Sequence, residues 1–286
     1  MSTLVDLNGL TMRPRPTEGE IDPGGFYFTT LTDWYTLPDS KASIRERAQA
    51  DGAFNIDRDW RQSAAPSIEG IYLGATDVDT TQAKRRLRAS WGTGTQGLMT
   101  VTDPNGPTSR AVSIRDVKVP DDHGRRYFTF SVDMVAPDPN RYGPVVSTSA
   151  GLPVAGTGYI WAAVWPADWG GGAGDSGRVT ITNEGDASTW PLILVGGGLD
   201  SGVEIVETTS GSTLRLERVI PQASTVYFDS RTGRVYLDTT DNDITGFLTR
   251  REWWSVPAGA TRIVQFNGLG AVTGIPVLTV QMAPAY

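Results

Sequence analysis

The residues best spaced for chemistry lie in a short polar segment of the second half. Oxygen-bearing side chains stand where a calcium-binding loop needs them: Asp241, Asp243, Thr245 and Glu252. Gly246 occupies the glycine position of the same template. That template requires a helix on each side, whereas residues 235–237 and 253–257 have the composition of strands. We therefore interpret the segment as a polar hairpin loop that binds no metal ion, with Asp, Asn and Gly providing turn geometry.

Catalytic groups of the common hydrolases are scarce. Cysteine is absent, which excludes disulfides, thiolate zinc sites and cysteine nucleophiles, and histidine occurs once, at His123. His123 lies in an Asp-Asp-His-Gly turn, where we expect a surface position. Carboxylates two residues apart, such as Glu184 and Asp186, would form a glycosidase pair only at a suitable spatial separation. No phosphate loop, dinucleotide fingerprint or nucleophile elbow is present, so we expect no catalytic residue and no cofactor.

Tryptophans are the second group with a chemical use, because exposed indoles stack on sugars and anchor protein interfaces. Five are candidates for such contacts: Trp161, Trp165, Trp169, Trp253 and Trp254. The first three precede a glycine-rich run, residues 170–174, and the last two are adjacent, so in a strand they point to opposite faces. Core packing is the alternative for each of them.

The charge balance limits the partners. The chain of 286 residues has a net charge of −7, with 17 basic and 19 acidic residues in 1–142 and 8 and 13 in 143–286. An acidic chain without a basic domain argues against binding to a nucleic-acid backbone. The beginning of the sequence has no basic region followed by an apolar core, and no apolar run approaches a bilayer span. We expect neither a signal peptide nor a membrane span.

Two helices are expected in the first half, alongside a β-meander. Helix formers after Asp39 and Ser40 predict a helix up to Ala50, and a Thr76 or Asp77 cap predicts a second one up to about Ser90. The four cations of the second helix could contact phosphate, but an ordinary solvated face is the simpler interpretation. Alternating segments predict strands at 68–73, 98–102, 110–119 and 127–135, which we expect to form an antiparallel meander.

The second half is expected to be almost wholly β. Residues 143–153 are rich in Pro, Gly and Ser and predict a linker. Nine short β-rich runs with turns between them then predict a two-sheet sandwich: 178–182, 192–195, 203–207, 213–219, 225–229, 234–238, 247–255, 262–266 and 276–282.

Several of these segments together resemble one protein family. The run Ile68-Glu69-Gly70-Ile71-Tyr72-Leu73-Gly74-Ala75-Thr76, the helix through Leu87, and the strand Phe128-Thr129-Phe130-Ser131-Val132 leading to residues 136–142 resemble the amino-terminal domain of distal tail proteins, minor tail proteins of phages with long non-contractile tails. The carboxy-terminal domain of that family is similar in residues 179–186, 190–194, 226–229 and 254–259.

The resemblance implies a mainly β fold with a few helices. Residues 1–142 would be an α+β ring-forming domain of antiparallel sheets with one or two helices, 143–153 a linker, and 154–286 a galectin-like β-sandwich. The family's function implies a hexameric ring that joins the tail tube to the tail-tip or baseplate proteins and the receptor-binding apparatus. The chain would then be a non-enzymatic virion component, located at the tail tip and assembled in the host cytoplasm, without cofactor or sequence-specific nucleic acid.

Two other functions remain open on the residues alone. A carbohydrate-binding module for host attachment would use exposed tryptophans of the second sandwich on a cell-surface glycan. A tail-associated cell-wall hydrolase would need a cleft with paired carboxylates. The Trp- and Gly-rich stretch 159–177 matches no element of the family.

Overall fold

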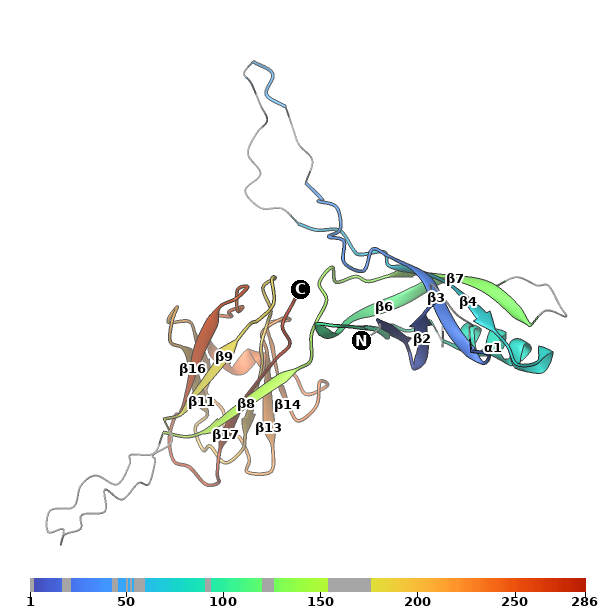
Figure 1. Ribbon diagram of the computed structural model, residues 1–286. Coiled ribbons are helices and arrows are strands. Elements are labelled where there is room, and N and C mark those ends of the chain that lie inside the picture. Colours follow the sequence, from blue (N-terminus) through green and yellow to red (C-terminus); the bar gives the residue numbers. More distant parts are fainter. Residues whose placement is uncertain are drawn as a thin grey trace, which may run out of the picture. The chain divides into compact units, whose positions relative to one another are not determined.

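The chain folds into two compact units of mainly β structure (Figure 1). The computed structural model describes residues 3–16, 22–42, 46–49, 51, 53, 60–90, 94–119, 126–153 and 176–286. Unit 1 spans Met1–Gly143 and unit 2 spans Pro144–Tyr286. None of the helices in the described ranges is long and apolar enough to cross a membrane.

Unit 1 is a closed barrel of seven strands. The strands are β1 (Leu4–Leu7), β2 (Leu10–Pro14), β3 (Gly25–Thr32), β4 (Ser67–Leu73), β5 (Gly97–Asp103), β6 (Gly106–Lys118) and β7 (Tyr127–Val135). Their order is β1-β2-β3-β4-β7-β6-β5, and β5 pairs with β1 to close the barrel. Neighbours are antiparallel except β2 and β3. The expected meander holds for β5, β6 and β7, but β4 pairs with β7 and β3 and not with β5.

The barrel core follows the alternation predicted for β7. Phe128, Phe130, Val132 and Met134 are buried, while the residues between them face outward, because successive side chains of a strand point to opposite faces. Phe128 stacks on Tyr72 of β4 with the ring centroids 5.4 Å apart. A Cβ atom on Gly70 would overlap the Phe130 ring and the Tyr27 carbonyl, so this close approach of strands requires glycine.

Helix α1 (Asp77–Ala89) confirms the second predicted helix and its cap. The hydroxyl of Thr76 accepts a hydrogen bond from the Asp79 amide at 3.1 Å, which satisfies one free N–H of the first turn. Ala83 and Leu87 are fully buried in the barrel core. The helix therefore covers the barrel with a narrow apolar stripe and leaves its arginines outside.

The helix predicted for 40–50 is wrong in the part of that range that the structure describes. Ser40 pairs with Arg61 and Glu46 with Ala53 in antiparallel bridges. We call the described residues of 39–62 the arm; they extend away from the barrel (Figure 1). Helix propensity is a weak preference, and pairing with the returning chain overrides it.

Unit 2 consists of two five-stranded antiparallel sheets. The strands are β8 (Val146–Gly151), β9 (Arg178–Thr182), β10 (Leu192–Gly196), β11 (Val203–Glu207), β12 (Thr213–Leu216), β13 (Thr225–Asp229), β14 (Arg234–Leu237), β15 (Leu248–Arg251), β16 (Thr261–Gly268) and β17 (Val277–Met282), with the short 3-10 helix η1 (Thr245–Phe247). The sheet orders are β14-β13-β10-β17-β8 and β15-β12-β11-β16-β9. Each of the nine predicted runs overlaps one of these strands. The tenth, β8, lies inside the stretch 143–153 that was expected to be a linker.

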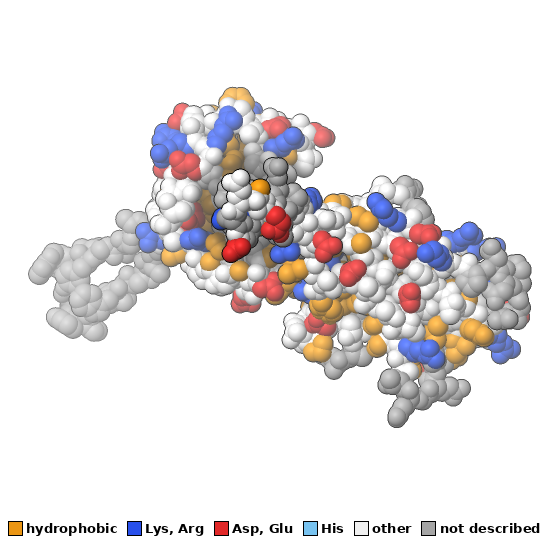
Figure 2. All heavy atoms as spheres, turned by 90° about the horizontal axis from the view of Figure 1, so that it is seen from above, with side chains coloured by type: hydrophobic (Ala, Val, Ile, Leu, Met, Phe, Trp, Pro, Cys, Tyr) orange, Lys and Arg blue, Asp and Glu red, His pale blue; other side chains and the backbone are white. Residues whose placement is uncertain are grey.

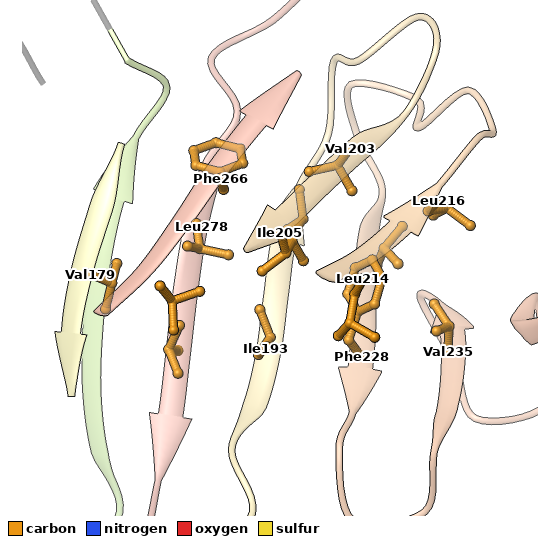
Figure 3. Packing of buried hydrophobic residues seen from close by; sticks show 14 of the residues in the cluster. Val179, Ile193, Val203, Ile205, Leu214, Leu216, Phe228, Val235, Phe266 and Leu278 are labelled. Atoms are coloured by element: carbon orange, nitrogen blue, oxygen red, sulfur yellow. The ribbon is translucent and has the colours of Figure 1, made fainter. Parts of the chain in front are cut away.

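A single hydrophobic core joins the two sheets of unit 2 (Figure 3). Ile193 and Phe228 from one sheet pack toward Ile205, Leu214 and Phe266 from the other, and all five are fully buried. Because both inner faces contribute to one cluster, the two sheets form a sandwich.

Candidate assembly interface

Part of the barrel sheet of unit 1 continues beyond the barrel as four strands. It consists of residues 29–32 of β3, 67–69 of β4, 131–135 of β7 and 113–118 of β6, which pair in this order. We call it the strand extension. The pairing of β2 with β3 ends at Phe28 and that of β5 with β6 ends at Val112, so neither β2 nor β5 reaches this part of the sheet.

The strand extension ends in two free strand edges. Among the described residues, no strand pairs with the outer side of 29–32 or of 113–118. Three of the four β3 residues are exposed, namely Thr29, Thr30 and Thr32. The edges lie on opposite sides of the extension, and each presents unpaired N–H and C=O groups that can template another strand.

A hollow of about 860 Å³ lies along this sheet, with Glu69 and Ile71 of β4, Ser131 of β7 and Lys118 of β6 among the residues around it. The ammonium group of Lys118 lies 3.3 Å from the Asp133 carboxylate. This hydrogen bond and the charge of Asp133 raise the pKa of Lys118, so the lysine carries its charge at neutral pH. The hollow is polar and charged as well as apolar, as is typical of the rim of a protein interface.

The arm adds an exposed aromatic surface. Trp60 is 60% exposed, and next to the arm Leu37 is 68% and Tyr35 is 54% exposed. The arm strands bond to each other through the Lys41 amide to the Trp60 carbonyl at 2.7 Å and the Gln62 amide to the Asp39 carbonyl at 2.9 Å. A two-stranded ribbon is only marginally stable by itself, and exposed large apolar side chains mark contact surfaces.

In unit 2 the segment that matches the calcium-loop template covers a strand edge. The Ile244 amide donates to the Val235 carbonyl at 2.8 Å, and the Leu237 amide to the Asn242 carbonyl at 3.0 Å. The Thr245 hydroxyl accepts the Val235 N–H at 2.8 Å, so this predicted ligand oxygen is already engaged. These bonds occupy the outer edge of β14.

The residues that match the ligand positions of the calcium template make separate hydrogen bonds. Asp243 accepts a hydrogen bond from the Thr245 amide, and bonding to Thr245 lowers the pKa of Asp243. Glu252 instead accepts the Thr213 amide at 2.8 Å, on another sheet. In the described ranges, no group of three or more His, Cys, Asp or Glu side chains could hold a metal ion.

The five candidate tryptophans divide into two sets. Trp161, Trp165 and Trp169 lie outside the described residues, as does His123. Trp254 is only 6% exposed and belongs to the core of unit 2, so its expected role as an exposed contact is wrong. Trp253 is half-buried against the same core. Among the described residues of unit 2, the exposed tryptophan is Trp190, at 43%, which the sequence analysis did not single out as a contact residue.

Charges of both signs are interspersed on the face shown in Figure 2, with hydrophobic patches between them. On helix α1, Lys84 lies 5.5 Å from the Phe128 ring centroid and Arg86 lies 5.8 Å from that of Phe26. Two of the four helix cations are thus engaged with the barrel's own aromatic rings, which favours the solvated-face interpretation over a phosphate site.

Comparison with known proteins identifies the fold. No protein-family model matches the sequence, and no curated protein matches it. Among solved structures, the chain is similar over 100% of both chains to the Dit protein of phage SPP1, described as "a Paradigm of Hub Adsorption Apparatus in Gram-positive Infecting Phages", with a TM-score of 0.65 and 13% identity. It is also similar to a chain of the phage P2 baseplate, over 98% of both chains, with a TM-score of 0.54 and 9% identity.

The fold is therefore that of structural proteins found in phage tail hubs and baseplates. Within that class, the chain is similar along its whole length to a Dit protein, which confirms the predicted resemblance to distal tail proteins.

Proposed function

We propose that this chain is a non-enzymatic structural component at the tip of a phage tail, where copies form a closed ring. Unit 1 makes the contacts between copies and joins the tail tube to the tip or baseplate proteins. Unit 2, a sandwich that the family resemblance predicts to be galectin-like, lies outside the ring contacts. The resemblance to distal tail proteins implies six copies.

The observation that carries the ring proposal is the strand extension. Its two free edges belong to different strands, β3 and β6, so pairing one copy's β6 with the next copy's β3 repeats the same contact around the assembly. Such a head-to-tail contact forms a ring when the rotation closes. The arm, with exposed Trp60, offers each copy a second surface toward its neighbours.

The test compares the mass of the full chain with that of two matched threonine variants. Thr30→Lys places a charge on the free edge of β3, and Thr180→Lys places the same charge at an exposed position of β9, the last strand of its sheet in unit 2, which contacts β8. A charge on an edge strand opposes strand addition. We expect closed rings in electron micrographs for the parent chain and for Thr180→Lys, and monomers for Thr30→Lys.

Two results would overturn the proposal. One is a parent chain that stays monomeric at high concentration and shows no ring density at the tip of isolated tails. The other is equal loss of rings in both variants, which would separate ring formation from the strand extension. Fragments divided at Gly143/Pro144 test the division of labour, because this boundary keeps β8 with its sheet.

One observation favours glycan binding by unit 2 as a second function. Tyr227 and Tyr236 are cross-strand partners on β13 and β14, and Leu194 on β10 is the next residue in that row. Trp190, just before β10, is exposed. Aromatic side chains on a flat sheet face can stack on sugar rings. We expect Trp190→Ala to weaken retention of the chain on purified host cell wall, with Phe247→Ala, which removes another exposed aromatic ring of unit 2, as the control; absence of any retention would exclude this function.

A further inference from the structure

The chain segments that precede and follow the arm are both linked to one short segment, residues 136–142. We call this segment the connector because it leads to the last residue of unit 1. The returning end is held by a reciprocal backbone pair. The Ala64 amide donates to the Ala136 carbonyl at 3.0 Å, and the Ala136 amide donates to the Ala64 carbonyl at 2.8 Å. The segment after the arm is thus bonded directly to the first residue of the connector.

The outgoing end is held by a buried arginine of β6. The guanidinium of Arg110 donates from Nη1 to the Asp33 carbonyl at 3.1 Å and from Nη2 to the Pro139 carbonyl at 2.7 Å. Asp33 precedes the arm and Pro139 lies in the connector, so one side chain bridges the two segments. Arg110 is 3% exposed and lies 5.2 Å from the ring of Trp34, which is 1% exposed. The planar fork of arginine fixes both carbonyls at once, which a lysine cannot do.

A second contact beside Arg110 joins the same two segments. Arg141 of the connector lies 4.8 Å from the ring centroid of Tyr35, and the Tyr35 hydroxyl donates to Asp103 at 2.9 Å. The connector is in turn fixed to β6 by the reciprocal pair of Tyr142 and Ser109, both bonds being 2.8 Å long. Tyr142 also donates its hydroxyl hydrogen to Asp138 at 2.7 Å.

The base of the arm encloses a hollow. A hollow of about 230 Å³ lies between its outgoing and returning ends, lined by residues 33, 36–39 and 62–65. Arg110 is also held at an energetic cost, because burial, together with the nearby Arg141, lowers its pKa to about 10, although Asp138 acts in the opposite direction. Arg110 is therefore a buried bridge beside the hollow at the base of the arm.

We propose that Arg110 couples the arm to the connector, so that a displacement of the chain at the end of unit 1 moves the arm. A pull at Gly143 acts on Pro139 and Ala136, and these two residues hold the outgoing and returning ends of the arm. A displacement that begins in unit 2 then changes the position of the arm, which is part of the surface that unit 1 offers to its neighbours. The coupling needs no ring, so its failure and that of the proposed function are distinguishable.

Hydrogen exchange of the full chain, resolved to short peptides, tests the coupling. Arg110→Met is expected to speed exchange of the Lys41 and Gln62 amides about fivefold to tenfold, the equivalent of one net hydrogen bond, without changing the β4 and β7 amides. Arg88→Met, which changes an exposed arginine of helix α1 outside the strand extension, is the control and should change none of them. If Arg110→Met unfolds the barrel, Arg110→Lys replaces it, because this variant keeps the charge and loses the fork.

A double-mutant cycle separates coupling from simple loosening. Tyr142→Phe removes a hydrogen bond inside the connector, away from the arm. It should speed exchange at Lys41 and Gln62 in the parent chain and have little additional effect in the Arg110→Met chain. The proposal is overturned if the effect of Tyr142→Phe stays within the connector, or if the two substitutions act additively on the arm amides.

Discussion

The sheet edges of unit 2 are covered by other parts of that unit, whereas two sheet edges in the described part of unit 1 are not. In unit 2, loop 241–245 bonds along β14, and the guanidinium of Arg251 donates to the Leu248 carbonyl at 3.2 Å, which blocks part of the edge of β15. The remaining edge strands, β8 and β9, contact each other. In unit 1, residues 29–32 and 113–118 are left without such cover in the described ranges.

This difference indicates which unit assembles. Folded proteins protect sheet edges because an exposed edge recruits other strands. Unit 2 satisfies its own edges and is expected to be stable as a monomer. Unit 1 closes a barrel and then extends part of its sheet beyond it, so its unsatisfied backbone groups are expected to find partners in other copies.

The largest expected effect comes from opening a cavity in each core. Phe228→Ala and Phe128→Ala remove fully or almost fully buried rings, at 0% and 2% exposure, from unit 2 and unit 1. Each should lower the free energy of unfolding of its own unit by about 3–5 kcal/mol. We expect Phe128→Ala to impair ring assembly as well, and Phe228→Ala to leave it intact. Calorimetry and mass measurement check both; a destabilised unit 1 in Phe228→Ala would show that the units are not independent.

Replacing Asn183 is expected to have a smaller effect on the free energy of unfolding, and it tests whether unit 2 is stabilised by its own contacts. Its buried side-chain amide donates to the carbonyls of Ala187, Val256 and Pro257, and its oxygen accepts the Gly185 amide. Asn183→Ala leaves these groups unpaired. It should lower the free energy of unfolding of unit 2 by about 3 kcal/mol, as measured by chemical denaturation. Asn183→Asp keeps the acceptor for Gly185 but places a buried carboxylate against the three carbonyl oxygens, so it should destabilise unit 2 at least as much as the alanine variant; the reverse order would contradict this account.

Sequence patterns predicted the strands of unit 2 well because several of them bury alternate residues, as β9, β10 and β11 do. Helix α1 was predictable from its cap at Thr76. Strands β1 and β2 were missed, although Asn8 and Gly9 between them have φ angles of 51° and 84°, as an Asn-Gly hairpin requires.

The candidate interface could not be predicted in the same way. Its free edges depend on where β2 and β5 stop pairing, and this register is a property of distant segments and not of local composition. The calcium template matched residue types correctly, but the structure uses Thr245 and Glu252 to bond backbone amides. Trp190 was not predicted as a contact residue because a single exposed tryptophan forms no periodic pattern in the sequence.

A moderate effect is expected at the contact between the helix and the barrel of unit 1. The Tyr72 hydroxyl donates to Asp79 at 2.8 Å and accepts from Arg86 at 3.2 Å. Tyr72→Phe should lower the free energy of unfolding of unit 1 by about 1 to 2 kcal/mol and leave unit 2 unchanged. Denaturant titration monitored by hydrogen exchange measures the two units separately. A change in the free energy of unfolding of unit 2 alone would contradict the placement of Tyr72 in the barrel.

The smallest expected effect is that of calcium on unit 2. Since Glu252 and Thr245 are engaged elsewhere, added calcium should not change the melting temperature relative to chelator-treated protein. Isothermal titration measures binding directly. A dissociation constant tighter than about 10⁻³ M would mean that the loop rearranges around an ion, and that the edge of β14 is less firmly covered than the structure indicates.

Closure of the barrel also determines when unit 1 can finish folding. Strand β1 pairs with β5, so Leu7 finds its partner Met99 only after most of unit 1 has been synthesised. At about 5–20 residues per second, the first strand waits several seconds on the ribosome for that partner. During this interval β1 and β2 exist only as a short hairpin, and the barrel cannot form. Because unit 2 follows unit 1 in the chain, the barrel can close while unit 2 is still being synthesised, so the free edges of the strand extension belong to a folded barrel before the chain is released.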